Sequence, residues 1–209
     1  MNDGFIAVWL LTILFILYMT GWHDLVAEEV PRRLVVIIAA AAAVLHFAEF
    51  TVHPAVQLRG SALCAVLAAV VSLVAMRQSF QALFLLLCSL LIGVIWLWSR
   101  YIYIIDPVFI LFRPGWDAPL IAGLLAGLMV DRFRSQSAAI IIAALLPPFA
   151  DLIRPLGAAK TVIIGSPSWW DGLAIAFVTV RLIANGKILI RRMTQRLLEA
   201  RSGQRGGST

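Results

Sequence analysis

Charged residues are scarce in this chain of 209 residues. They make up 13% of the sequence, and hydrophobic residues make up 62%, whereas soluble globular domains carry about 25% charged residues. The mean hydropathy is +0.95, and apolar runs long enough to cross a bilayer recur along the chain. The composition therefore excludes a soluble domain and predicts an integral membrane protein.

The known catalytic signatures are also absent. The sequence contains no Walker loop, no Gly-x-Ser-x-Gly, no His-Glu-x-x-His and no Cys-x-x-Cys. We expect no cofactor and interpret the chain as a non-catalytic structural or partner-binding membrane component. Two alternatives stay open: a small-solute transporter or permease-like protein with an outer-facing polar pocket, and an intramembrane metal-dependent enzyme acting on a lipid-like substrate.

Cysteine is rare, and the N-terminal segment lacks the features of a cleaved signal. Cys64 and Cys88 both lie inside apolar segments, which indicates packing residues rather than a disulfide. The opening segment "MNDGFIAVWLLTILFILY" has no basic residues before its apolar part, and no small-x-small cleavage site follows it. We expect this segment to remain in the protein as its first span.

The apolar runs predict an all-α fold, a polytopic bundle of about seven transmembrane helices. The predicted spans are 4–21, 34–51, 61–75, 80–98, 117–130, 137–153 and 169–190. The connections 99–116 and 154–168 are too apolar for solvated loops, so we expect outer re-entrant or interfacial segments there, with re-entry of 101–112 left open. Residues 1–193 would form the transmembrane domain, and residues 194–209 would form a basic cytoplasmic tail.

Basic residues set the expected orientation. With the N-terminus outside, the cytoplasmic side receives eleven of them, Arg32, Arg33, Arg77, Arg132, Arg134, Lys187, Arg191, Arg192, Arg196, Arg201 and Arg205, and the outer side receives five, Arg59, Arg100, Arg113, Arg154 and Lys160. This bias predicts an N-out, C-in multi-pass protein. The basic tail is expected to bind anionic lipids of the bilayer rather than nucleic acid. A protein partner or a homo-oligomer is also compatible with the sequence.

Two helix starts share a Trp-Asp pattern. Trp116-Asp117 and Trp169-Trp170-Asp171 each stand directly before an apolar run. An aspartate at a helix N-terminus accepts from unpaired amides, and tryptophan favours the headgroup depth. We expect both pairs to cap and anchor their helices. A duplicated helix pair with parallel topology is the alternative.

Ionisable residues in apolar surroundings are candidates for a polar pocket, because they are costly to hold in lipid. The candidates are Asp106, Arg113, Asp117, Asp151, Arg154 and Arg181. Arg181 either snorkels toward the inner interface or needs an acidic partner or an aqueous cavity. The candidate partners are Asp106, Asp151 and Glu49. Asp151 either pairs with Arg154 three residues away or lines a pocket beyond the Pro147-Pro148 break.

A second candidate set suggests metal binding. His46, Glu49 and His53 are spaced i, i+3 and i+7, so on one helix they would share a face and could supply ligands for zinc. The alternative places His53 among the headgroups and pairs Glu49 with a neighbouring arginine.

The stretch "DPVFILFRPGWDAPLIAGLLAGLMVDRF", together with the length and the span layout, resembles the YphA-type small polytopic membrane proteins of spore-forming Gram-positive bacteria. This resemblance implies the plasma membrane of a bacterium. It brings no assigned activity and no catalytic residues.

Overall fold

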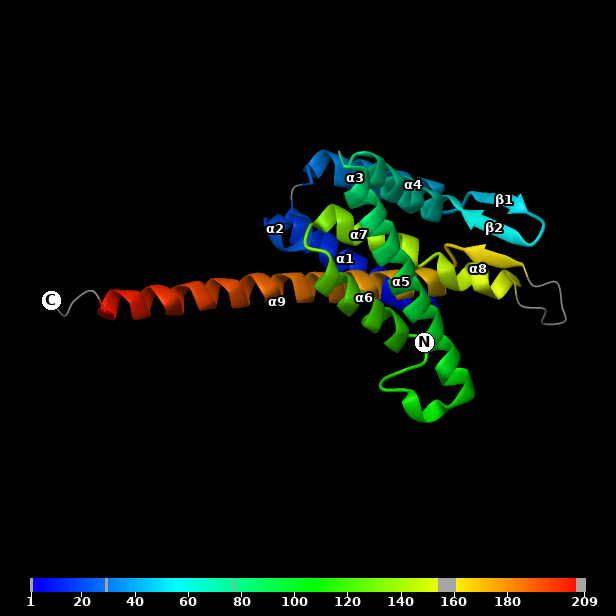
Figure 1. The fold of residues 1–209 in the computed structure, drawn as a ribbon. Helices are drawn as coiled ribbons and strands as arrows, with labels where there is room; N and C mark the ends of the chain where they lie inside the picture. The colour runs from blue at the N-terminus through cyan, green and yellow to red at the C-terminus, as the bar shows by residue number, and fades with distance from the viewer. Residues whose placement is uncertain (1, 29, 77, 154–160, 206–209) are drawn as a thin grey trace.

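The computed structural model describes residues 2–28, 30–76, 78–153 and 161–205, and most of them are helical (Figure 1). The helices are α1 (Phe5–Met19), α2 (His23–Val26), α3 (Arg32–Leu45), α4 (Gly60–Val74), α5 (Ser79–Ile105), the 3-10 helix η1 (Pro107–Phe109), α6 (Asp117–Met129), α7 (Phe133–Ala143), α8 (Leu146–Ile153) and α9 (Pro167–Arg205). The strands are β1 (Glu49–His53), β2 (Val56–Arg59) and β3 (Val162–Ile164).

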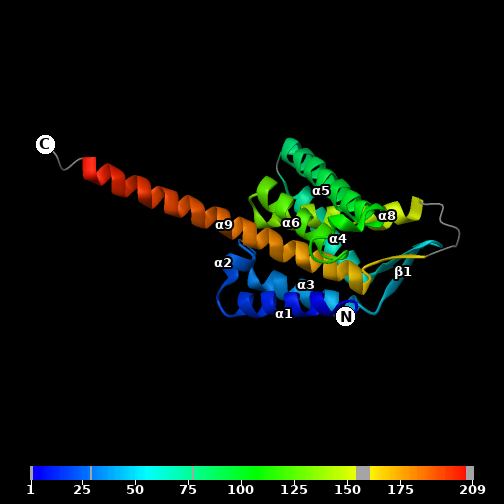
Figure 2. The same cartoon turned by 90° about the horizontal axis from the view of Figure 1, so that it is seen from below.

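Helix α9 is the centre of the bundle, with α1 and α6 packed along its first half (Figure 2). The contact with α6 depends on small residues. A Cβ added to Gly123 would lie 2.6 Å from the carbonyl oxygen of Ala176, and one added to Gly127 would lie 2.8 Å from Cβ of Ile183. Small residues let helix backbones approach closely, and such contacts hold helices together where lipid removes the hydrophobic driving force.

Two ends of the bundle can be defined along α9. At the Asp171 end, the amide of Gly4 donates to Asp171, and the indole of Trp169 donates to the carbonyl oxygen of Ala144. At the Lys187 end, Lys187 donates to the carbonyl oxygen of Gly127. Helices α1 and α6 therefore run parallel to α9, whereas α7, which finishes beside Trp169, runs antiparallel to it.

A small sheet corrects the all-α prediction. The predicted second span 34–51 ends at Leu45, and the chain then forms the antiparallel β1–β2 hairpin, with β3 parallel to β2. The segment "FTV" is rich in residues that favour strands. Pro54 also disfavours a helical conformation at His53. These local preferences outweigh the apolar composition on which the helix prediction was based.

Three helical segments among the described residues are long and apolar enough to cross a membrane: 79–105, 133–152 and 167–199. The helices Phe5–Met19, Gly60–Val74 and Asp117–Met129 are apolar but shorter. The prediction of a helical integral membrane protein therefore agrees with the fold. Helix α5 also continues to Ile105, so the first residues of the predicted outer segment 101–112 belong to a helix.

Two predicted segments, the span 137–153 and the tail 194–209, do not coincide with single elements of the structure. The predicted span 137–153 is divided into α7 and α8, with Pro147 and Pro148 in the first turn of α8. A proline is tolerated there because the first amides of a helix have no partner within it. The predicted tail 194–209 begins inside α9, whose described part continues to Arg205 and projects beyond the bundle (Figures 1 and 2).

Candidate functional site

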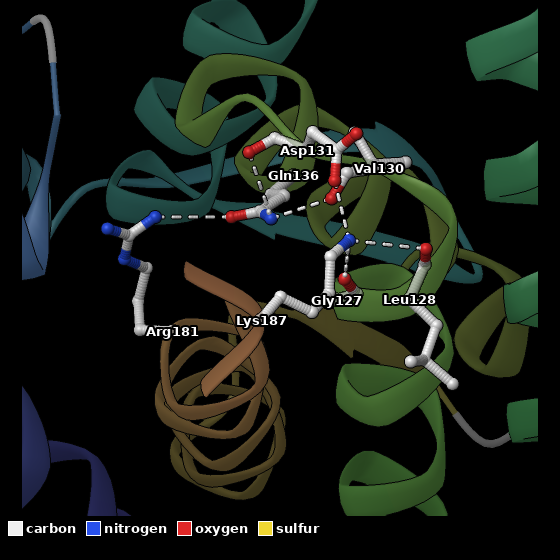
Figure 3. Close-up of polar contacts among 7 residues, drawn as sticks. All are labelled: Gly127, Leu128, Val130, Asp131, Gln136, Arg181 and Lys187. Atoms are coloured by element: carbon white, nitrogen blue, oxygen red, sulfur yellow. Dashed lines mark hydrogen bonds and ion pairs between the residues drawn. The ribbon is translucent and has the colours of Figure 1, made fainter. Parts of the chain in front are cut away.

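Arg181 lies in the middle of α9 and is only 4% exposed. Its Nε donates to the carbonyl oxygen of Leu25 at 2.9 Å, and Nη2 donates to the carbonyl oxygen of Asp24 at 3.3 Å. Nη1 donates to Oε1 of Gln136 at 3.3 Å (Figure 3). The guanidinium also lies 5.3 Å from the ring centre of Phe133, which is within the range of a cation–π interaction. The direct contacts of this cation are thus neutral groups from two other segments, and the carboxylate of Glu28 acts on it from a greater distance.

Gln136 connects Arg181 to the turn between α6 and α7. This side chain is 1% exposed, and its Nε2 donates to the carbonyl oxygen of Val130 at 2.7 Å (Figure 3). The amide therefore uses its oxygen for the arginine and its nitrogen for the backbone, which fixes its orientation. A buried polar residue with both ends satisfied holds α7 at a defined position against α9.

Lys187 binds the same turn from the other side. Its Nζ donates to Oδ1 of Asp131 at 2.5 Å and to the carbonyl oxygen of Gly127 at 3.0 Å (Figure 3). The hydrogen bond from Lys187 lowers the pKa of Asp131, which lies in the turn outside the helices. The positive charge of Lys187 is therefore compensated within the protein.

A cavity of about 120 Å³ lies between these groups at the Lys187 end. Its walls are formed by Glu28, Asp131, Arg181, Ala184, Lys187, Ile188 and Arg191. A cavity that holds one water needs on the order of 10–15 Å³. This cavity can therefore contain several waters or a small polyatomic ion.

The other described members of the predicted pocket lie elsewhere. Asp106 caps η1 by accepting from the amide of Val108, and the guanidinium of Arg113 lies 5.6 Å from the ring centre of Trp116. Asp151 pairs with Arg100 at 3.6 Å. Arg154 lies outside the described residues, so the predicted Asp151–Arg154 pair is untested. None of Asp106, Asp151 and Glu49 is a hydrogen-bond or ion-pair partner of Arg181, and that part of the prediction is wrong.

The aspartates of the two Trp-Asp pairs do bind backbone amides, but not those of their own helices. Asp117 is 1% exposed and accepts from the amides of Leu111 and Phe112. Asp171 accepts from the amides of Gly4 and Ala7. Each carboxylate therefore holds a different segment against the start of its helix, rather than capping that helix as predicted.

The predicted metal-binding face is not formed, because its three residues do not share a helix. His46 follows α3, whereas Glu49 and His53 stand at the two ends of β1. Nδ1 of His46 lies 3.2 Å from the hydroxyl of Ser61, and Glu49 pairs with Arg59 at 3.7 Å. The alternative pairing of Glu49 with a neighbouring arginine is thus confirmed. Within the part of the chain that the structure describes, no group of three potential ligands could hold a metal ion.

The family can be assigned from the sequence as a whole. The family model of the YphA-like integral membrane proteins matches residues 3–206. The chain belongs to this family. No match was found among curated proteins or among solved structures. The resemblance to YphA-type membrane proteins is therefore confirmed, and the membrane assignment of this YphA-like protein rests on both the family and the apolar helices.

The sequence alone pointed to Arg181 in this YphA-like protein, but not to the residues around it. Gln136 is neutral, so a search for ionisable residues in apolar segments passes over it. The carbonyl groups of Asp24 and Leu25 stand more than 150 positions before Arg181 in the chain. The one available signal was Gln136 itself, a polar side chain near the start of an apolar run.

Proposed function

We propose that this YphA-like protein is a non-catalytic structural component of a bacterial plasma membrane, which it crosses seven times with its N-terminus outside. In this proposal the half of α9 from Lys187 onward, which we call the projecting half, rests on the anionic inner leaflet. The observation that carries the proposal is the composition of that half: one continuous helix with an exposed apolar stripe and with Arg191, Arg192 and Arg196 outside that stripe.

The directions of the helices support seven crossings. The Asp171 end gathers the starts of α1 and α9 and the close of α7. A Cβ on Gly165, just before α9, would lie 2.7 Å from Ala62 near the start of α4, and one on Gly60 would touch Leu45 at the close of α3. A Cβ on Gly172 would contact Trp96, so the second half of α5 also lies at the Asp171 end. Successive apolar helices thus alternate in direction, as crossings joined by short connections do.

The basic residues support the orientation. Arg32 at the start of α3, Arg132 and Arg134 near the start of α7, and Lys187 lie where helices enter or leave the Lys187 end. An excess of Lys and Arg marks the cytoplasmic side. The Lys187 end is therefore cytoplasmic in this proposal, and the sheet lies outside.

The projecting half of α9 is amphipathic. Leu189, Ile190, Met193 and Leu197 are each more than half exposed, and their spacing places them on one side of the helix. We name these four residues the apolar stripe. Arg191, Arg192 and Arg196 lie on the remaining circumference. A basic amphipathic helix binds an anionic membrane surface through both parts.

Length and direction favour contact of this half with the inner leaflet. The 39 residues of α9 span roughly 58 Å at about 1.5 Å per residue, against a hydrocarbon core of about 30 Å. In Figure 1, α9 crosses α5 steeply, so the two helices cannot both stand upright in a bilayer. About half of α9 therefore lies outside the hydrocarbon core, and a tilt of α9 brings this projecting half toward the lipid surface.

A second copy of the chain is a poorer partner for the stripe. Pairing two such helices side by side would bring Arg191, Arg192 and Arg196 of both copies together, and like charges at a helix seam oppose pairing. Anionic lipid has the complementary charge.

The uses of the ionisable residues support a structural role. Asp117 and Asp171 bind backbone amides, Asp151 pairs with Arg100, and Glu49 pairs with Arg59. These groups hold segments of the protein together instead of converging on one outer pocket.

Cysteine labelling tests the docking of α9. In a Cys64→Ala, Cys88→Ala background, Met193→Cys on the stripe and Leu198→Cys among the arginines each carry an environment-sensitive fluorophore. In phosphatidylglycerol vesicles we expect a blue-shifted emission from position 193 and an aqueous emission from position 198. In phosphatidylcholine vesicles we expect an aqueous emission from the fluorophore at both positions.

The same variants separate the possible failures. Aqueous emission from position 193 in both vesicles would mean that α9 projects freely, and equal emission from both positions would mean that no face is preferred. Either result overturns the docking. The orientation is tested separately with Asn2→Cys and Gln195→Cys: an impermeant maleimide should label only the first from outside intact cells.

A further inference from the structure

Arg181 is a buried cation with no carboxylate at hydrogen-bond or ion-pair distance among the described residues. Its three hydrogen-bond acceptors, the carbonyls of Asp24 and Leu25 and the amide of Gln136, are neutral. Neutral acceptors satisfy N–H groups without neutralising the charge, and the exposed carboxylate of Glu28 on the cavity wall compensates it only from a distance. A buried charge is costly unless it is paired. The site therefore favours a compensating anion.

The guanidinium retains capacity to bind one. Arginine has five N–H donors, and the described contacts use three of them, one on each nitrogen. One N–H on each terminal nitrogen remains, and Arg181 forms part of the cavity wall. The planar fork of a guanidinium matches the oxygens of a phosphate or a carboxylate.

The other cavity walls favour a phosphate. Residues 181, 184, 188 and 191 of α9 share one face, so Arg191 faces the same cavity as Arg181. Asp131 is occupied by Lys187, whereas Glu28 has no described hydrogen bond or ion pair and opposes an incoming anion. Two arginines on one wall are better suited to a group with several charged oxygens than to a single carboxylate.

We propose that this cavity is a binding site for a phosphate group, supplied either by the headgroup of an anionic lipid or by a free phosphate ion. Arg181 binds the phosphate oxygens through its two remaining N–H donors, and Arg191 adds charge at the entrance. Glu28 limits the affinity. The site lies on the opposite side of α9 from the apolar stripe, so it goes beyond the proposed docking of α9 and does not depend on it.

A thermal-shift titration of the full chain in uncharged micelles tests the site. One arm adds inorganic phosphate, compared with chloride at equal ionic strength. The other adds a short-chain phosphatidylglycerol, compared with the diacylglycerol of the same chain length, which lacks the phosphate. Stabilisation by phosphate itself indicates the free ion, and stabilisation by phosphatidylglycerol alone indicates the headgroup. No stabilisation in either arm overturns the proposal.

Variants show whether any stabilisation comes from this cavity. Glu28→Gln removes the opposing charge from an exposed position, so it should tighten binding by about two- to fivefold, as expected for a partly exposed charge pair. Arg191→Gln should weaken binding by a similar factor, whereas Arg192→Gln, the same change one residue away and off the cavity wall, should leave it unchanged. Equal losses from Arg191→Gln and Arg192→Gln would indicate general charge attraction and overturn the site.

Arg181→Gln should reduce the affinity by about tenfold or more, because charge-assisted hydrogen bonds are lost. This variant also removes contacts to Asp24 and Leu25 and could fail to fold. The test then rests on Glu28→Gln: an unchanged or weaker affinity in this variant would contradict the proposal.

Discussion

Asp171, in the first turns of α9, accepts a hydrogen bond from the backbone amide of Ala7 at 2.7 Å. The amide of Gly4 donates to the same carboxylate, also at 2.7 Å. The last helix of the chain thus caps the N-terminus of the first. The cap satisfies amides that α1 cannot satisfy itself and places a negative charge at the positive end of its dipole. The two helices start at the same level because one side chain joins them.

Removing this cap should destabilise the protein. We expect Asp171→Ala to cost about 1–2 kcal/mol, the upper part of the range for N-caps, and Asp171→Asn to cost less because one acceptor oxygen remains. Thermal unfolding in detergent measures both. Asp3→Ala, an exposed aspartate nearby, should leave the midpoint unchanged, and an equal effect of the two alanine variants would contradict the assigned cap.

Asp117 should hold the connection between α5 and α6. Its buried carboxylate accepts from the amides of Leu111 and Phe112, and an unsatisfied buried amide costs about 1–3 kcal/mol. Asp117→Ala should therefore loosen residues 106–116, seen as faster hydrogen exchange of those two amides. Asp106→Ala, which removes an exposed cap on Val108, should leave the exchange of Leu111 and Phe112 unchanged. Similar exchange in both variants would mean that Asp117 does not hold this connection.

Much of the helical layout was predictable because it depends on local composition. Apolar runs located α1, α4, α6 and the first half of α9 to within a few residues. The sheet was missed because "AEFTVH" is apolar enough to extend a helix prediction, and its β-branched residues form only a short signal. Pairing of β2 with β3 joins residues more than 100 positions apart, which no local pattern predicts.

The environment of Arg181 was predictable only in part. Its cost in an apolar helix follows from the sequence, and so does the need for compensation. The partners do not, because two of the three are backbone carbonyls, which every residue has, and the third is the neutral Gln136. The search for carboxylates therefore selected residues with other uses: Asp106 caps η1, and Asp151 pairs with Arg100. Glu49, the third candidate, pairs with Arg59.

The contact between Lys187 and Asp131 should give a small acid-dependent stability. Lys187 lowers the pKa of Asp131 in the folded protein, so the contribution is present above the unfolded pKa, near 4, and is lost as the pH falls through the folded value. The Asp131 side chain is 66% exposed, so we expect less than about 1 kcal/mol. Melting curves of the protein and Asp131→Asn should converge as the pH falls from 6 to 3. A constant difference would show that this pair is not the source.

The close approach of α6 and α9 should make Gly123 intolerant of a side chain. A Cβ at this position would lie 2.6 Å from the carbonyl oxygen of Ala176 and 2.7 Å from Cβ of Thr179. The first neighbour is backbone, so the two helices must separate. Overpacking of this kind typically costs about 1–3 kcal/mol, and we expect Gly123→Ala to lower the midpoint of thermal unfolding accordingly.

Gly186 provides the matched control for this change. It lies in α9, the other helix of this pair, with nothing within 4 Å of an added Cβ. Glycine in a helix interior is less favourable than alanine by about 0.5–1 kcal/mol. Gly186→Ala should therefore raise the midpoint, while Gly123→Ala lowers it. Opposite shifts of the unfolding midpoint from the same Gly→Ala change would separate the effect of helix–helix contact from that of helix propensity. A stabilising effect at both positions would mean that α6 and α9 do not approach as closely as these residues indicate.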